Sequence, residues 1–207
     1  MVNLTDAYLI KKNSPTRVAH DYYPTPPIAT QALLDYVAVP DVLWEPAAGR
    51  GWISKVLEDN GHGVYSSDLH RYNNKQVDSI WTGLDFLTTT RLPFSNIEGI
   101  VTNPPYKHAT EFVVKALEHT NFVAFFCRLT FLEGARRYEK VFKNFPPDIY
   151  VFSGRVNCQE EKFGTLKGQK GGMMGYAWFV WSSSNCGMTT WIDPDYSKLY
   201  KETMNES

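Results

Sequence analysis

The chain has 207 residues, a net charge of −1 and 43% hydrophobic residues, and this length is enough for one domain with its own hydrophobic core. Its three cysteines are widely spaced and form no CxxC pair, which argues against a disulfide framework or a zinc site. No apolar run is long enough to cross a membrane, and the first residues lack the pattern of a secretory signal. We therefore expect a cytoplasmic protein in a reducing compartment, with no metal site and no membrane association.

The charge is unevenly distributed along the chain. Residues 107–170 contain 11 Lys and Arg against 7 Asp and Glu, whereas the remainder contains 10 against 15. A basic segment of this kind is compatible with an ordinary solvated surface and with a surface that binds nucleic acid.

In chain order, residues 1–20 are polar and aperiodic and are interpreted as a flexible arm. The segment Tyr23-Pro24-Thr25-Pro26-Pro27 leads into an apolar stripe at helical spacing, with Thr25 as the expected N-cap and Pro26 as the first helical residue. Short apolar runs that alternate with further helical patterns predict seven strands, at 42–44, 63–67, 79–81, 99–102, 122–127, 149–152 and 176–181.

This alternation indicates an α/β fold with a mostly parallel seven-stranded sheet and helices on both faces. The aromatic residues Trp178, Phe179 and Trp181 fit a buried core strand better than an exposed platform for bases. Residues 155–175 are rich in glycine and lysine and lack periodicity, so we interpret them as a mobile loop between the last two strands.

The most informative motif is Asn103-Pro104-Pro105-Tyr106, directly after the predicted strand 99–102. Two consecutive prolines remove two backbone donors and fix two φ angles, so they form a stiff, extended corner. The amide oxygen of Asn103 and the carbonyl oxygen of Pro104 can each accept a hydrogen from an amine, and Tyr106 can stack on a flat ring. The corner therefore suits a planar substrate that carries an –NH2 group, and a plain proline turn is the structural alternative.

A second motif, Glu45-Pro46-Ala47-Ala48-Gly49-Arg50-Gly51, lies between a predicted strand and a predicted helix, where glycines let a ligand approach the backbone. It lacks the Lys-Ser/Thr pair of a phosphate loop and the full dinucleotide fingerprint. Asp68 ends the next strand, from which a carboxylate can bind ribose hydroxyls, and Glu45 suits a cationic partner. Asp85 can accept from the amine of an adenine while Phe86 packs against the ring, although Asp85 also fits a helix cap. Together these residues predict a nucleoside-type ligand.

The order of these motifs resembles that of class I S-adenosylmethionine-dependent methyltransferases that act on the N6 amine of adenine in DNA, in particular the small phage and prophage type. The resemblance extends over about residues 21–181 and is carried by YPTPP, EPAAGRG, SSD, LDF and NPPY. It implies a Rossmann-like class I methyltransferase fold, S-adenosylmethionine as cofactor, DNA as partner, and a location in the cytoplasm of a bacterial or phage-infected cell.

The resemblance also implies roles for individual residues. The catalytic clamp would consist of Asn103, Pro104, Pro105 and Tyr106. The cofactor would be held by Tyr23, Thr25, Pro26, Glu45, Pro46, Ala47, Gly49, Gly51, Asp68, Leu69, Asp85, Phe86 and Asn103. A single domain over residues 1–207 leaves no separate target-recognition domain, so contacts to nucleic acid would come from Arg136, Arg137, Arg155, Lys162, Lys167 and Lys170.

Several activities share such a site. The NPPY motif also occurs in methyltransferases that act on adenine or guanine in RNA and on a glutamine in proteins, and a cytosine-N4 enzyme is a further alternative. The YPTPP element ahead of the glycine turn favours the DNA class with a short or loose sequence preference. A non-catalytic module that binds nucleic acid through a degenerate methyltransferase fold is the remaining alternative, against which the intact Asn103 and Asp68 argue.

Overall fold

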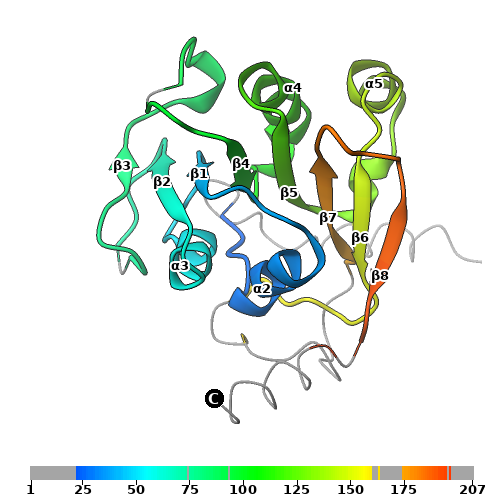
Figure 1. The fold of residues 1–207 in the computed structure, drawn as a ribbon, viewed down its shortest axis with the longest axis horizontal. Coiled ribbons are helices and arrows are strands. Elements are labelled where there is room, and N and C mark those ends of the chain that lie inside the picture. Colours follow the sequence, from blue (N-terminus) through cyan, green and yellow to red (C-terminus); the bar gives the residue numbers. More distant parts are fainter. Residues whose placement is uncertain are drawn as a thin grey trace, which may run out of the picture.

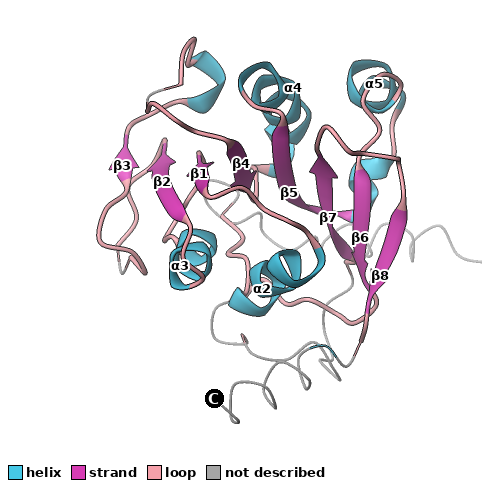
Figure 2. Ribbon diagram, viewed as in Figure 1, coloured by secondary structure: helices cyan, strands magenta, loops and turns pink. Residues whose placement is uncertain are grey.

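The computed structural model describes residues 22–73, 75–92, 94–159, 163, 174–194 and 196. In this part of the chain, strands form one eight-stranded sheet in the order β3-β2-β1-β4-β5-β7-β6-β8. The strands are β1 (Val42–Glu45), β2 (Gly63–Asp68), β3 (Trp81–Thr82), β4 (Gly99–Thr102), β5 (Phe122–Arg128), β6 (Asp148–Phe152), β7 (Tyr176–Trp181) and β8 (Thr189–Ile192). Figure 2 shows them as a continuous central layer.

Helices cover both faces of the sheet. The helices α2 (Pro27–Tyr36) and α3 (Trp52–Asp59) lie on one face, and α4 (Ala109–His119) and the short α5 (Ala135–Arg137) lie on the other (Figure 1). Shorter turns of helix are η3 (Phe86–Thr88), η4 (Tyr106–His108), η5 (Leu129–Leu132) and η6 (Tyr138–Phe142).

Two hydrophobic cores separate these layers, as the alternation of side chains along the strands requires. Along β5, Ala124 and Phe126 pack with α2 and α3, whereas Val123, Phe125 and Cys127 pack with α4. The predicted core strand is confirmed, because every residue of β7 is buried. The indole of Trp178 also donates a hydrogen bond to the Ala29 carbonyl oxygen of α2 (2.7 Å), which ties that helix to the sheet.

The strand directions create a crevice at one edge of the sheet. Strands β3, β2, β1, β4 and β5 run parallel, and the chain leaves β1 toward β2 but returns through β4 on the other side. Such a reversal of strand order leaves an open crevice outside the carboxyl ends of the strands. Strand β7 is antiparallel to both of its neighbours, β5 and β6.

The predicted α/β class with a mostly parallel sheet is confirmed, and two details of the prediction are wrong. The sheet has eight strands instead of seven, because β8 joins the edge beside β6. Its sequence, with exposed Thr189 and Trp191, lacks the continuous apolar run of a buried strand. Strand β3 is two residues long and begins at Trp81 instead of Ser79. The predicted arm at 1–20 and most of the predicted loop at 155–175 lie outside the described residues.

Close packing around Gly99 yields a first prediction. A Cβ atom on Gly99 would lie 2.8 Å from Cδ1 of Phe122 and 3.1 Å from Cδ2 of Leu43, and both side chains are buried. We expect Gly99→Ala to lower the free energy of unfolding by about 1–3 kcal/mol, as overpacked core positions do. Gly63→Ala is the control, because the nearest atom to its Cβ would be 3.8 Å away. Equal denaturation midpoints for the two variants would show that the Phe122 side chain can move aside without lowering the free energy of unfolding.

Candidate active site

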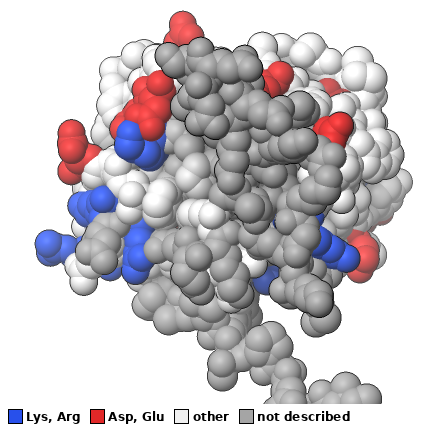
Figure 3. Space-filling model, turned by 90° about the horizontal axis from the view of Figure 1, so that it is seen from below, with Lys and Arg blue, Asp and Glu red and all other residues white. Residues whose placement is uncertain are grey.

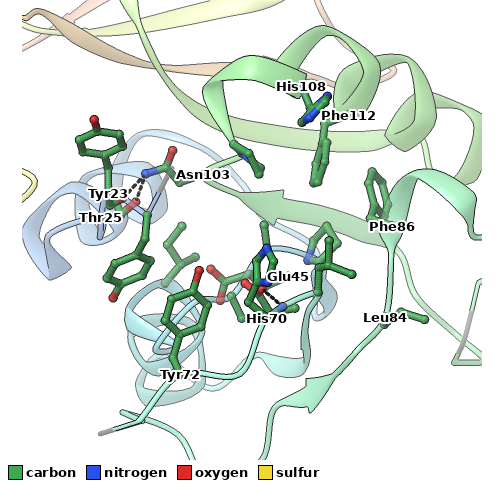
Figure 4. A pocket seen from close by; sticks show the side chains of 18 of the residues that line it. Tyr23, Thr25, Glu45, His70, Tyr72, Leu84, Phe86, Asn103, His108 and Phe112 are labelled. Carbon is green, nitrogen blue, oxygen red and sulfur yellow. Dashed lines mark hydrogen bonds between the residues drawn. The ribbon is translucent and has the colours of Figure 1, made fainter. Parts of the chain in front are cut away.

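A cavity of about 630 Å³ opens at the carboxyl ends of β1, β2 and β4 (Figure 4). Ten of the residues predicted to bind a cofactor line it, namely Tyr23, Thr25, Glu45, Pro46, Ala47, Asp68, Leu69, Asp85, Phe86 and Asn103. The clamp residue Pro105 also lines it. Pro26, Gly49, Gly51, Pro104 and Tyr106 are not among its lining residues.

The glycine turn after β1 is shaped by its own hydrogen bonds. Gly49 and Gly51 have φ values of 57° and 84°, in the left-handed region that favours glycine. The Gly49 N–H donates to Oδ2 of Asp68 (2.8 Å), so the turn is fastened to the end of β2. A Cβ on Gly49 would lie 2.4 Å from the ring of Tyr22, which covers the turn. The two glycines therefore do not line the cavity but determine the shape of the turn that forms its wall.

Asp68 connects two loops at the rim of the cavity. Besides the Gly49 N–H, its carboxylate accepts the His70 N–H at Oδ1 (2.7 Å), and the residue is only 7% exposed. Both carboxylate oxygens thus have backbone partners, and the side chain is fixed in place at the strand end. A carboxylate oxygen can accept more than one hydrogen bond, so these contacts leave capacity for a ligand hydroxyl.

Glu45 is buried at the base of the cavity and anchors helix α3. Its Oε2 accepts the Ser54 N–H (2.8 Å) and a short hydrogen bond from the Ser54 hydroxyl, which also contacts the hydroxyl of Ser66 (2.6 Å). Burial raises the pKa of Glu45 to about 8, although the hydrogen bonds from Ser54 act in the opposite direction. The side chain is therefore largely protonated at neutral pH unless a cationic group enters the cavity.

Asp85 caps a helical turn, which was the alternative interpretation from the sequence. Its Oδ1 accepts the Leu87 N–H (3.0 Å) at the start of η3. Phe86 is 2% exposed and packs edge-on against Trp44 (5.1 Å between ring centres) and beside Phe112 (4.8 Å). Both residues still border the cavity, where Phe86 and Phe112 form an apolar wall (Figure 4).

Asn103 is oriented by the segment that precedes α2. Its Nδ2 donates to the carbonyl oxygen of Tyr23 (2.7 Å) and to the hydroxyl oxygen of Thr25 (3.0 Å). A carbonyl oxygen cannot donate, so the amide nitrogen must face Tyr23 and the amide oxygen must face away. Within the described residues, that oxygen accepts no hydrogen bond. Thr25 was predicted as a helix N-cap, but α2 begins at Pro27 after Pro26, and the Thr25 hydroxyl instead accepts from Asn103.

Tyr106 lies beside the corner in an aromatic cluster. Its ring stacks on that of Tyr23 (5.0 Å between centres, 22° between planes), and its hydroxyl donates to that of Tyr176 (3.3 Å). The guanidinium carbon of Arg128 lies 4.2 Å from the Tyr106 ring centre and 5.2 Å from that of Tyr23. Arg128 and Tyr23 are thus too close together to lie over opposite faces of the Tyr106 ring.

The structure gives two of the predicted nucleic-acid contacts a partner within the protein. Arg136 forms an ion pair with Glu111, and Arg137 donates to the carbonyl oxygens of Thr130 (3.1 Å) and Glu133 (2.6 Å). Arg155 is exposed, and Lys162, Lys167 and Lys170 lie outside the described residues. On the face in Figure 3, described basic side chains lie mostly in the lower half of the view and acidic ones mostly in the upper half.

The sequence did not identify several residues of the cavity wall. The tilted rings of Tyr22 and Tyr72 pack against each other at its rim (4.8 Å between ring centres), and His70 and His108 also line it. No motif marked these residues, because they come from loops and a short turn of helix whose positions depend on the packed sheet. Within the described residues, no three His, Cys, Asp or Glu side chains are grouped to hold a metal ion, and no helix is long and apolar enough to span a membrane.

The strand order and the crevice define the Rossmann-like fold of class I methyltransferases, and solved structures share it. A type I restriction-modification methyltransferase subunit from Streptococcus thermophilus has a TM-score of 0.56 and 11% identity, over 97% of this chain and 56% of that chain. A Listeria monocytogenes protein assigned as a class I S-adenosylmethionine-dependent methyltransferase has a TM-score of 0.58 and 10% identity, over 97% and 76%.

A Pyrococcus horikoshii protein assigned as an RNA methyltransferase has a TM-score of 0.54 and 15% identity, over 87% of this chain and 98% of that chain. This chain therefore spans about half the length of the Streptococcus subunit and nearly all of the Pyrococcus protein. No protein-family model and no curated protein matches the sequence. Identities this low show a common fold.

The buried Glu45 predicts a specific pH dependence of stability. Its pKa is about 8 in the folded protein and near 4.5 when unfolded, so the folded state holds a proton that the unfolded state releases between these values. As the pH rises from 5.5 to 7.5, the free energy of unfolding of the wild-type protein should therefore fall by about 1.4 kcal/mol per pH unit relative to that of Glu45→Gln. Chemical denaturation of both proteins across this range measures the difference, and parallel curves would show that Glu45 is ionised when folded.

Proposed function

We propose that this chain is an S-adenosylmethionine-dependent methyltransferase that methylates the N6 amine of adenine in DNA. The observation that carries the proposal is the orientation of Asn103, whose nitrogen is occupied by Tyr23 and Thr25 while its oxygen is directed elsewhere. An amide held in this way is an acceptor for an amine hydrogen. Its position, between a stiff proline corner and a cavity with acidic residues at three strand ends, matches a site for a planar amine beside a nucleoside.

The cavity fits the proposed cofactor. Its volume of about 630 Å³ lies within the range of small-ligand sites. We propose that Asp68 accepts from the ribose hydroxyls and that Phe86 and Phe112, which line the cavity, pack against the adenine ring. Glu45, buried and protonated without a ligand, can become a counter-charge for an ammonium group. S-adenosylmethionine, when bound, supplies a methyl group on a positively charged sulfur.

The corner residues prepare the amine for attack. The nitrogen lone pair of adenine is delocalised into the ring, which makes the amine a weak nucleophile. We propose that Oδ1 of Asn103 and the carbonyl oxygen of Pro104 accept the two amine hydrogens and so favour a more tetrahedral nitrogen. Because both acceptors are fixed before the substrate binds, no reorganisation is needed at the moment of reaction. A base within a duplex must first be extruded from the stack to reach this corner.

Base stacking on Tyr106 remains a prediction. The ring is held on one side by Tyr23 and Arg128, so a base would have to approach it from elsewhere. We also propose that the whole chain acts as one domain and that the basic residues of 155–175 contact the phosphate backbone. RNA is the alternative substrate, and a Pyrococcus protein of similar fold is assigned to that activity. Labelled cofactor with DNA, RNA and protein acceptors, followed by nucleoside mass analysis, distinguishes these substrates.

Asn103→Ala is the decisive test of the mechanism. We expect methyl transfer to fall about 100-fold or more, because a positioned hydrogen-bond acceptor is lost, while cofactor binding and the fold survive. Single-turnover assays with saturating cofactor measure the step. Asn144→Ala, at an exposed asparagine far along the chain, serves as the matched control. Full activity per folded molecule in Asn103→Ala would exclude the proposed role of the amide.

Asp68→Ala tests the cofactor site. We expect it to weaken S-adenosylmethionine binding by about 1.5–3 kcal/mol, the usual scale for a lost hydrogen bond to a charged group. Because Asp68 also accepts the Gly49 N–H, Asp68→Asn is needed beside it, since an amide oxygen can keep that contact without the charge. Isothermal titration calorimetry gives both affinities. An unchanged affinity in a folded Asp68→Ala protein would remove this residue from the binding site.

A further inference from the structure

Arg128 is a cation that the structure holds beside the proline corner. It is the last residue of β5, and the pairing of Thr102 with Phe125 places it beyond the end of β4, at the level where Asn103 to Tyr106 begin. Its guanidinium lies 4.2 Å from the Tyr106 ring centre. The register of β5 with β7 sets Tyr176 opposite Arg128, so β5 and β7 both contribute to this corner.

The charge of Arg128 has no counter-charge within the described residues. No carboxylate forms an ion pair with it, and its Nε is buried without a hydrogen-bond partner. Its polar neighbours are neutral at physiological pH, because burial raises the pKa of Tyr176 to about 12 and that of Cys158 to about 12. The pKa of the Tyr106 hydroxyl is also raised well above its ordinary value, chiefly by burial.

Other arginines near this edge are satisfied within the protein. Arg136 is paired with Glu111, and Arg137 donates to two backbone carbonyl oxygens. Removing a cation from water is costly unless an anion or hydrogen bonds compensate it. Arg128 is only partly buried, so water and the contact with two aromatic faces offset part of that cost, and an anion from outside the described residues would neutralise the charge.

We propose that Arg128 binds a backbone phosphate of the nucleotide whose base enters the Asn103 corner. This inference rests on the proposed function and extends it, because it makes the phosphodiester a part of what the site recognises. Guanidinium groups bind phosphate through two parallel hydrogen bonds, and the hydroxyls of Tyr176 and Tyr106, which hydrogen-bond to Arg128, use only part of its five N–H donors. A peptide offers Arg128 only neutral carbonyl oxygens, which bind a guanidinium less strongly than a charged phosphate does, so the residue favours nucleic acid over protein substrates.

The test uses a short single-stranded DNA with one adenine among thymines. We expect Arg128→Gln to weaken its binding on the order of tenfold at low salt, with cofactor affinity unchanged. The slope of log affinity against log salt should fall by about 0.7, the value for one phosphate contact on a single strand. Arg128→Lys should keep the slope, since it keeps the charge. Lys143→Gln, which removes one positive charge near the start of β6 at the opposite edge of the sheet, should leave both quantities unchanged.

A modified substrate tests the same contact without relying on a variant that folds poorly. Replacing the phosphates on either side of the adenine by neutral methylphosphonates should weaken wild-type binding about as much as Arg128→Gln does. Applied together, the two changes should not add, because they remove the same contact. A wild-type salt slope in Arg128→Gln, or fully additive effects, would overturn the inference and assign Arg128 to bracing Tyr106 alone.

The outcomes also separate this inference from the proposed function. Adenine methylation that depends on Asn103, combined with an unchanged salt slope in Arg128→Gln, would refute the phosphate contact and leave the function standing. A lowered slope with full activity in Asn103→Ala would support the phosphate contact and refute the catalytic role of the corner. Methylation of a peptide glutamine without DNA binding would refute both.

Discussion

The two hydrogen bonds from the Asn103 amide are the interaction on which the site depends. They join β4 to the backbone of Tyr23 and the side chain of Thr25, which are 80 and 78 residues away in the sequence. The stacking of Tyr23 on Tyr106 fastens the same two segments a second time. The proline corner is thus stiff because of its own covalent geometry, and its orientation is set by the segment that precedes α2.

The acidic residues around the cavity form structural hydrogen bonds in the absence of a ligand. Glu45 fastens the start of α3, Asp68 joins the glycine turn to the end of β2, and Asp85 caps η3. Each carboxylate is therefore pre-positioned by backbone N–H groups, which limits its movement. A ligand that binds these groups gains a rigid surface, and a substitution among them alters both the shape of the cavity and its contacts.

The fold and about half of the cavity wall were predictable from the sequence, because strand ends carry local signals. Asn103 follows a buried strand and precedes two prolines, and Asp68 ends the next strand after a glycine turn. The contributions of Tyr22, Tyr72 and Arg128 were not predictable, since each acts through contacts set by the packed sheet. Thr25 shows the limit of local rules, because its residue type fits a helix cap and its hydroxyl instead accepts from Asn103.

The antiparallel direction of β7 has a consequence for how this chain can diverge. Because β6 ends and β7 begins at the crevice edge, the connection between Phe152 and Tyr176 must leave and return at the edge of the sheet on which the cavity opens. Closing a longer flexible loop there costs only about 0.6 kcal/mol for each doubling of its length. Segments of different length and composition can therefore be exchanged at this point without changing the strand order. The topology provides a tolerant insertion site at the same edge of the sheet as the cavity.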